Sequence, residues 1–181
     1  MAFGIYQHYA HTIIAWHTLW KGKLISMDLS ILGYEIKNIP HKAGRGVFIE
    51  GELVARFLGI HEFYQFLLEE KVDWLPIISK RLLSDSIILV IAREVLFVID
   101  VKYQKVAGHV DEDLLTCDFT RKQYLKLVGL LGLKVEYIYV LNDWFRKKEY
   151  KDVLDYICSV NCHYIFNEFP FSWLGLSIKK G

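Results

Sequence analysis

The feature that most constrains this chain is the run IILVIAREVLFVIDVKYQ, residues 87–104, which predicts a β-hairpin. Two stretches of apolar and β-branched residues, 87–92 and 95–103, flank the polar pair Arg93 and Glu94. Two such stretches separated by two polar residues indicate antiparallel strands joined by a two-residue connection. A hairpin here fixes which side chains share a face of the sheet.

The predicted register brings three charged residues to one face. Counting outward from the connection places Asp85 opposite Lys102 and makes Asp100 a diagonal neighbour of Asp85. Since paired residues share a face and side chains alternate along a strand, all three project to the same side. The two residues would lie roughly 7–8 Å apart by backbone geometry, and closer at their carboxylates if these lean together, so that one divalent cation could bridge them. A connection with an odd number of residues would turn Asp85 to the opposite face.

The other face of this hairpin would carry Phe97, Ile99 and Val101, an apolar row suited to packing against helices. Charged groups near a buried strand are unfavourable unless they pair or bind a metal, which favours a functional site. The ordinary alternative is that Asp85 is a turn residue and that Lys102 neutralises Asp100 as a simple ion pair.

Composition limits the class of protein. The 181 residues correspond to one compact domain, and 53% hydrophobic with 15% aromatic content predicts a substantial core. The formal charge of +1 argues against binding of polyanions through bulk positive charge. No apolar run reaches the roughly 20 residues that cross a bilayer, and the first residues lack a basic segment typical of a signal peptide. We therefore expect a soluble, cytoplasmic protein.

Three local basic clusters stand out against this near-neutral balance, although the usual explanation of each is a solvated face. They are Lys37, His41, Lys42 and Arg45; Arg121, Lys122 and Lys126; and Arg146, Lys147, Lys148 and Lys151.

The remaining pattern predicts an alternation of helices and strands. Residues 47–70 suit an amphipathic helix with a break near Gly59, and Glu50 and Glu52 would lie in or near its first turn. The further predicted elements are a strand at 74–82, a helix from Asp118 through Leu131, a strand at 134–141, a helix at about 150–158 and a strand at 162–166, with loops at 38–46 and 105–116. The order is helix, three strands, helix, strand. Because the last strand–helix–strand passage implies a parallel pair, the sheet should be mixed.

This order, Asp85 and the triplet Asp100-Val101-Lys102 together resemble the PD-(D/E)XK nuclease superfamily, in particular type II restriction endonucleases. The segments VIDVKYQKVAGHVDEDLLTCDFTRKQY and VEYIYVLNDWF are similar to those of bacterial restriction enzymes. The resemblance covers roughly residues 35–168, with Ser84 where the family often has Pro and Asp100 where Glu is commoner. It implies an α/β fold, a mixed β-sheet flanked by helices with an αβββαβ core over residues 35–168. Residues 1–181 would form a single nuclease domain, in which residues 1–34 are an amino-terminal arm or an extension whose structure the sequence leaves open.

The resemblance also implies a chemistry and a metal. Asp85 and Asp100 would hold Mg²⁺, for which Mn²⁺ should substitute, and Lys102 would orient or deprotonate the attacking water. The helix-borne acid that many members add to the metal site maps best to Glu52, with Glu50 next, and a match to Gln104 after the triplet is weaker. The reaction would hydrolyse phosphodiester bonds and leave 5′-phosphates.

Double-stranded DNA is the implied partner. The predicted contacts come from the loops on either side of the hairpin and from the second basic cluster, and the acidic loop has a solvated turn or an indirect metal contact as its alternative. The residues are Lys42, Arg45 and Lys122 for phosphates, and His109, Asp111 and Glu112 for base edges.

A homodimer acting on a palindrome is expected by the same resemblance, with an interface from the amino-terminal arm or residues 164–173. A cognate DNA methyltransferase in the same system is a further suggested partner. The alternatives are a structure-selective, repair or nicking endonuclease of the same fold, a catalytically inactive DNA-binding protein, and a generic α/β domain whose hairpin acids form an ion-pair network.

Overall fold

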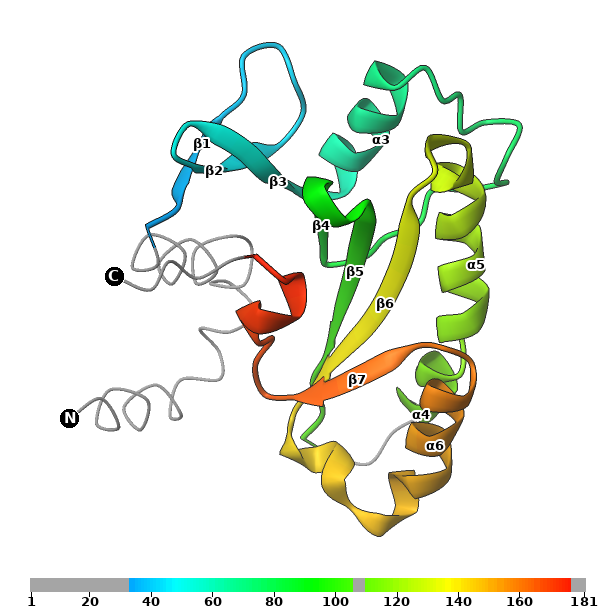
Figure 1. Ribbon diagram of the computed structural model, residues 1–181. Helices are drawn as coiled ribbons and strands as arrows, with labels where there is room; N and C mark the ends of the chain where they lie inside the picture. Colours follow the sequence, from blue (N-terminus) through cyan, green and yellow to red (C-terminus); the bar gives the residue numbers. More distant parts are fainter. Residues whose placement is uncertain (1–32, 106–109, 177–181) are drawn as a thin grey trace, which may run out of the picture.

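The computed structural model describes residues 33–105 and 110–176, which form one seven-stranded sheet with helices packed on it (Figure 1). The strands are β1 (Glu35–Asn38), β2 (Arg45–Ile49), β3 (Glu52–Leu58), β4 (Ser86–Val90), β5 (Val95–Lys102), β6 (Lys134–Leu141) and β7 (His163–Phe166). The helices are α3 (Ile60–Glu69), α4 (Val110–Leu114), α5 (Cys117–Val128) and α6 (Lys151–Ser159). Short 3₁₀ turns are η2 (Ile91–Arg93), η3 (Gly129–Leu131), η4 (Asp143–Arg146), η5 (Lys148–Tyr150) and η6 (Phe171–Leu174).

The sheet is mixed, and its strands lie in chain order from β1 to β7. Each neighbouring pair from β1–β2 to β4–β5 is antiparallel, whereas the pairs β5–β6 and β6–β7 are parallel. Helices α5 and α6 make the two crossovers that parallel strands require. The predicted α/β class and mixed sheet are therefore confirmed, and the strand predicted at 134–141 is β6.

Each face of the sheet has its own core. On one face, Leu89, Leu96 and Val98 pack with α3, α5 and α6, and Figure 1 shows α5 and α6 together on this side. On the other face, Phe97 and Ile99 pack with residues of the carboxy-terminal segment that includes η6. Alternation places Asp100 and Lys102 on the helix-covered face. The prediction that the Phe97 row faces the main helices was wrong, because these helices cover the polar side of the hairpin.

The helix predicted over residues 47–70 is mostly replaced by a hairpin of β2 and β3, and only α3 is helical there. The turn is Glu50-Gly51, whose φ angles of 52° and 84° match the two left-handed positions of a type I′ turn. Ile49 pairs with Glu52 across it. The apolar residues of this segment fit both the helical and the strand spacing, and pairing of β3 with β4 favours the strand.

The strand predicted at 74–82 was also wrong, since this segment forms turns and bends around Pro76. In the described residues the order is three strands, α3, two strands, α4 and α5, one strand, α6 and β7. The helix predicted from Asp118 begins one residue earlier, and Gly132, with φ of 71°, follows the turn η3 that ends it. Over the part of the chain that the structure describes, no helix combines the length and the apolar character needed to cross a membrane. Residues 1–32, which include nearly all of the predicted arm, lie outside the described residues.

Candidate active site

The β4–β5 hairpin sets the site, and its connection has four residues, not two. Val90 pairs with Val95, leaving Ile91 to Glu94 in the turn, which closes with a hydrogen bond of 3.1 Å from the Glu94 N–H to the Ile91 carbonyl. Four is also an even number, so the predicted face is kept. The ladder ends at Ser86 and Ile99. One step further, Asp85 lies opposite Asp100, closer than the diagonal position that the sequence predicted.

Asp85 and Asp100 meet where β4 ends and β5 continues. The Asp85 N–H donates to Asp100 Oδ1 at 3.2 Å, and the Val101 N–H donates to Asp85 Oδ2 at 2.8 Å. Each carboxylate is thus held by the backbone of the opposite chain segment. Asp85 is exposed and Asp100 is half-buried, so the pair joins the protein interior to solvent. Carboxylate oxygens each have a second lone pair available for a metal or a water.

Tyr137 on β6 completes the environment of Asp100, because its hydroxyl donates to Asp100 Oδ2. Burial raises the pKa of Asp100, and the nearby charge of Asp85 adds to the rise, whereas the bonds from Tyr137 and the Asp85 N–H and the charge of Lys102 act against it. Burial, and then the Asp100 charge, raise the pKa of Tyr137 as well. The phenol therefore keeps its proton and remains a donor to the carboxylate.

Lys102 projects from the same face of β5, but among the described residues its ion pair is with a different acid. Its ammonium is 3.8 Å from Asp113 Oδ2 on α4, and the Lys102 side chain is 28% exposed. The Asp113 carbonyl accepts from the Tyr139 hydroxyl at 3.1 Å, which ties α4 to β6. The simple Lys102–Asp100 ion pair considered as an alternative is thus not the closest contact of the lysine. A cation remains beside the two carboxylates without neutralising them directly.

The donor set suits a hard divalent cation. Mg²⁺ is commonly held by one or two carboxylates, with waters and substrate phosphates completing an octahedron. Asp85 and Asp100 offer two carboxylates at a solvent-facing position, and a bound cation would offset the repulsion that raises the pKa of Asp100. Among the described residues there is no group of three or more His, Cys, Asp or Glu side chains placed to hold a metal. The fit is therefore to a two-carboxylate site that relies on water and substrate.

The structure does not bring Glu52 to this site. Glu52 is exposed at the start of β3, beside the Glu50-Gly51 turn, and lies on no helix. The other end of β3 adjoins β4 near Asp85, since Leu58 pairs with Ile87. Leu58 is six positions along the strand from Glu52, which is about 20 Å. The prediction that Glu52 or Glu50 is a helix-borne acid was wrong as to the element, because the segment is a hairpin.

The predicted phosphate contacts are spread over the molecule. Lys42 is exposed in the turn before β2, next to Ala43, whose N–H donates to Glu69 of α3. Arg45 is half-buried at the start of β2. Lys122 on α5 is exposed and bonds Asp118 at 2.6 Å.

The predicted base contacts fall on or beside α4. Glu112 is an exposed residue of this helix, and Asp111 belongs to it, although its side chain is not among the described ones. His109 lies outside the described residues. Gln104 is buried, and its backbone exchanges two hydrogen bonds with the Asn142 side chain, at 3.2 and 2.9 Å. The Gln104 backbone thus joins the ends of β5 and β6.

Sequence reasoning missed Tyr137, Asp113 and Asn142. The signal for Tyr137 was the alternation of Tyr137 and Tyr139 in a strand predicted to lie in the same sheet as the hairpin. Using it required the parallel register of β5 and β6, in which Asp100 pairs with Tyr139 and Val98 with Tyr137. Asp113 and Asn142 come from connections, whose course the sequence pattern does not define.

Comparison of the chain with protein-family models, with curated protein sequences and with solved structures finds no significant match.

Proposed function

We propose that this protein is a Mg²⁺-dependent nuclease that hydrolyses phosphodiester bonds of double-stranded DNA, with sequence-specific cleavage of the type II restriction kind as its expected form. The observation that carries the proposal is the juxtaposition of Asp85 and Asp100 across the open end of β4 and β5, with Lys102 on the same face. The mixed sheet with a helical crossover between β5 and β6 is compatible with a restriction-endonuclease-like core.

The chemistry follows from what these groups can do. Asp85 and Asp100 would hold the metal, which supplies a water of lowered pKa and charge stabilisation at phosphorus. Lys102 would orient the attacking water or take its proton, and its charge would stabilise the additional negative charge of the transition state. Tyr137 fixes one oxygen of Asp100, so that carboxylate needs little reorganisation when substrate arrives. Glu52 has no role in this scheme.

The proposal is tested by incubating the purified chain with plasmid DNA of varied sequence and with branched DNA in Mg²⁺, and by sequencing the ends of the fragments. Discrete fragments with constant ends and 5′-phosphates are expected. Cleavage confined to branches would replace the restriction form with a structure-selective nuclease.

Variants separate the site from a contaminating nuclease. Lys102→Ala should abolish cleavage, whereas Lys134→Ala, a lysine at the far end of the neighbouring strand β6, should retain it. Equal cleavage by wild type and Lys102→Ala would exclude the proposed site. In that case the DNA-binding protein without chemistry becomes the better description.

A further inference from the structure

We propose that the carboxyl ends of β6 and β7 carry a surface that holds the DNA backbone beside the scissile phosphate. This inference rests on the proposed nuclease function and assigns part of its substrate binding. The surface, called here the strand-end cluster, consists of Arg146, Lys147 and Lys148 with the rings of Trp144 and Phe166. It belongs to a basic segment for which the sequence alone gave only a solvated face.

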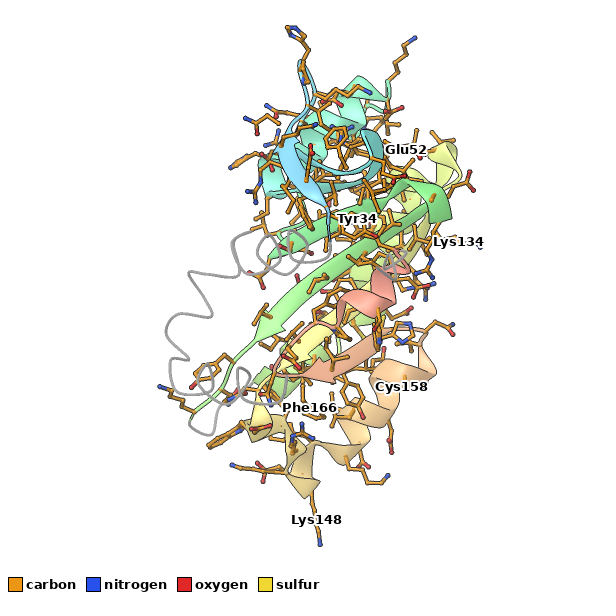
Figure 2. All side chains as sticks on the ribbon, turned by 60° about the vertical axis from the view of Figure 1, so that its left-hand side comes forward. Tyr34, Glu52, Lys134, Lys148, Cys158 and Phe166 are labelled. Carbon is orange, nitrogen blue, oxygen red and sulfur yellow. The ribbon has the colours of Figure 1, made fainter. Side chains whose placement is uncertain are left out.

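Sheet register places this cluster next to the candidate active site. Lys102 at the end of β5 pairs with Leu141 of β6, which pairs with Phe166 of β7. Adjacent strands lie about 4.8 Å apart, so the Phe166 backbone is roughly 10 Å from that of Lys102. In Figure 2, Phe166 and Lys148 lie toward the same end of the molecule, and Glu52 lies at the opposite end.

Two of the cations lie over aromatic rings. The Arg146 guanidinium is 4.0 Å from the centroid of Phe166, and the Lys147 ammonium is 3.0 Å from that of Trp144. The Trp144 indole donates to the Tyr150 hydroxyl at 2.8 Å, which fixes the ring. Cations placed over rings keep their charge while losing conformational freedom in advance. The cluster is thus arranged before any ligand binds.

The charges are only partly balanced within the protein. Asp143 bonds Arg146 at 2.8 Å and also accepts from Asn167 at 2.8 Å, so Arg146 is partly neutralised. Lys147 and Lys148 have no ion pair with an acid within the described part of the chain, and Figure 2 shows the Lys148 side chain extending away from the protein. Glu149 and Asp152 are the other acids close by in the chain. Lys147 and Lys148 are thus the cations of the cluster that no ion pair occupies among the described residues.

Two other exposed lysines form ion pairs with acids of their own helices. Lys122 bonds Asp118, and Lys151 bonds Asp155, each at 2.6 Å and four residues apart. Such pairs are typical of a solvated helix face. The strand-end cluster differs because Lys147 and Lys148 have no such partner among the described residues, and because its Phe166 lies two strands from Lys102 in the sheet.

The spacing suits a DNA strand. Each strand of a duplex carries one phosphate per about 3.4 Å of axial rise, so a phosphate bound at Lys102 has further phosphates within roughly 10 Å. Lys147 and Lys148 would neutralise those neighbours, and Arg146 would join when it leaves Asp143. These contacts would fix the position of the strand without reading its sequence.

Binding without cleavage tests the surface. Affinity for a fluorescently labelled mixed-sequence duplex is measured by anisotropy in Ca²⁺, over a series of salt concentrations, for Lys147→Gln/Lys148→Gln and for Lys126→Gln/Lys134→Gln, two exposed lysines away from the cluster. Both double variants remove two positive charges, so long-range charge effects cancel. The first should bind about 10- to 50-fold more weakly and lose nearly two from the slope of log K against log salt, whereas the second should change little. Lys147→Arg/Lys148→Arg should keep the affinity, and melting curves show that all variants are folded.

Equal losses in the two glutamine variants, or no loss in either, would overturn the inference. Cleavage in Mg²⁺ is measured separately. If the protein binds DNA through this cluster but never cuts it, the proposed function is refuted and the binding surface stands. If the protein cuts DNA and Lys147→Gln/Lys148→Gln binds as well as wild type, the binding surface is refuted and the proposed function stands.

Discussion

Two charged clusters lie on the helix-covered face of the same sheet, and they are balanced in opposite ways. Arg56 on β3 is 3% exposed and donates to Glu69 of α3 at 2.9 Å and to the Ala43 carbonyl. Glu69 in turn accepts from the Ala43 N–H. One cation, one anion and the backbone are thus bonded to one another, while Arg56 Nε is buried without a hydrogen-bond partner among the described residues. This cluster ties α3 and the turn before β2 to the sheet.

The Asp85–Asp100 cluster brings two like charges together. Lys102, the cation on the same face, lies nearest to Asp113. Burial, and then the nearby charge of Asp85, raise the pKa of Asp100. A buried ion pair closed on itself maintains a structure, whereas two carboxylates at a solvent-facing edge leave room for an external cation.

The largest expected effect is on chemistry. Asp100→Asn keeps the shape of the side chain and removes the charge that would hold the metal, so cleavage should fall by at least ~1,000-fold, about 4 kcal/mol in transition-state stabilisation. The rate is measured on plasmid DNA in Mg²⁺, and melting should show a folded variant. If Asp100→Asn retained wild-type cleavage, the Asp85–Asp100 cluster would, like the Arg56–Glu69 cluster, have a structural role only.

The next effect is on stability at the other cluster. Arg56→Ala leaves Glu69 without its cation and should destabilise the fold by about 3 kcal/mol, as removal of one partner of a buried pair does. Urea unfolding measures this, and the cleavage rate per folded molecule should stay unchanged. A loss of cleavage in a still-folded Arg56→Ala protein would assign this cluster to the site as well.

Stability against pH should separate the clusters further. Because the pKa of Asp100 is raised in the folded state, its contribution to stability is greatest at low pH and is lost as the pH rises from the ordinary aspartate range through the raised pKa. Asp100→Asn should therefore remove a decline in the free energy of unfolding over that window, and saturating Mg²⁺ should reduce the decline in the wild type. Unfolding curves at several pH values, with and without Mg²⁺, provide the measurement. An unchanged pH profile in Asp100→Asn would show that the carboxylate is not strained by its surroundings.

A smaller change is expected at Tyr137. Tyr137→Phe removes a donor that lowers the pKa of Asp100, so this pKa should rise further. Mn²⁺ affinity should then fall several-fold at a given pH, with its midpoint moved to higher pH. Tyr150→Phe, another buried tyrosine whose hydroxyl is bonded elsewhere, is the matched control. A similar shift in both variants would mean that Tyr137 acts through general stability alone.

The smallest effect is predicted at Glu52. Glu52→Gln should change cleavage and Mn²⁺ binding by less than about 2-fold, since roughly 20 Å of strand separates it from the end of β3 nearest Asp85. The same assays as for Asp100 measure this. A large loss would restore the sequence-based assignment of a third acid and contradict the placement of β3.

The sequence was most informative where local pattern and global fold agree. The β-branched run of β6 and the apolar runs of β4 and β5 were predictable because buried strands need such residues on both faces. The shared face of Asp85 and Asp100 followed from parity, which survived an error of two residues in the connection, whereas the predicted pairing of Asp85 with Lys102 was wrong.

The main error in predicting secondary structure came from a segment whose apolar residues fit both helical and strand spacing. Residues 47–58 have apolar spacing that suits a helix, yet Glu50-Gly51 forms a turn and the flanking residues form strands. The strand conformation is favoured by long-range pairing of β3 with β4, which local sequence does not reveal. The acid ligand assigned to Glu52 was lost with that helix. Tyr137, Asp113 and Asn142 could not be assigned from sequence, because each acts across strands or from a connection.

By itself, the sequence determined that a hairpin would carry Asp85, Asp100 and Lys102 on one face, since alternation along a strand is a local property of the backbone. The tertiary structure decided what surrounds that face. Parallel pairing of β5, β6 and β7 brings Tyr137 to Asp100 and places Phe166, with Arg146 over its ring, two strands from the end of β5. Contacts of this kind depend on strand order and register between residues far apart in the chain, which no local pattern specifies.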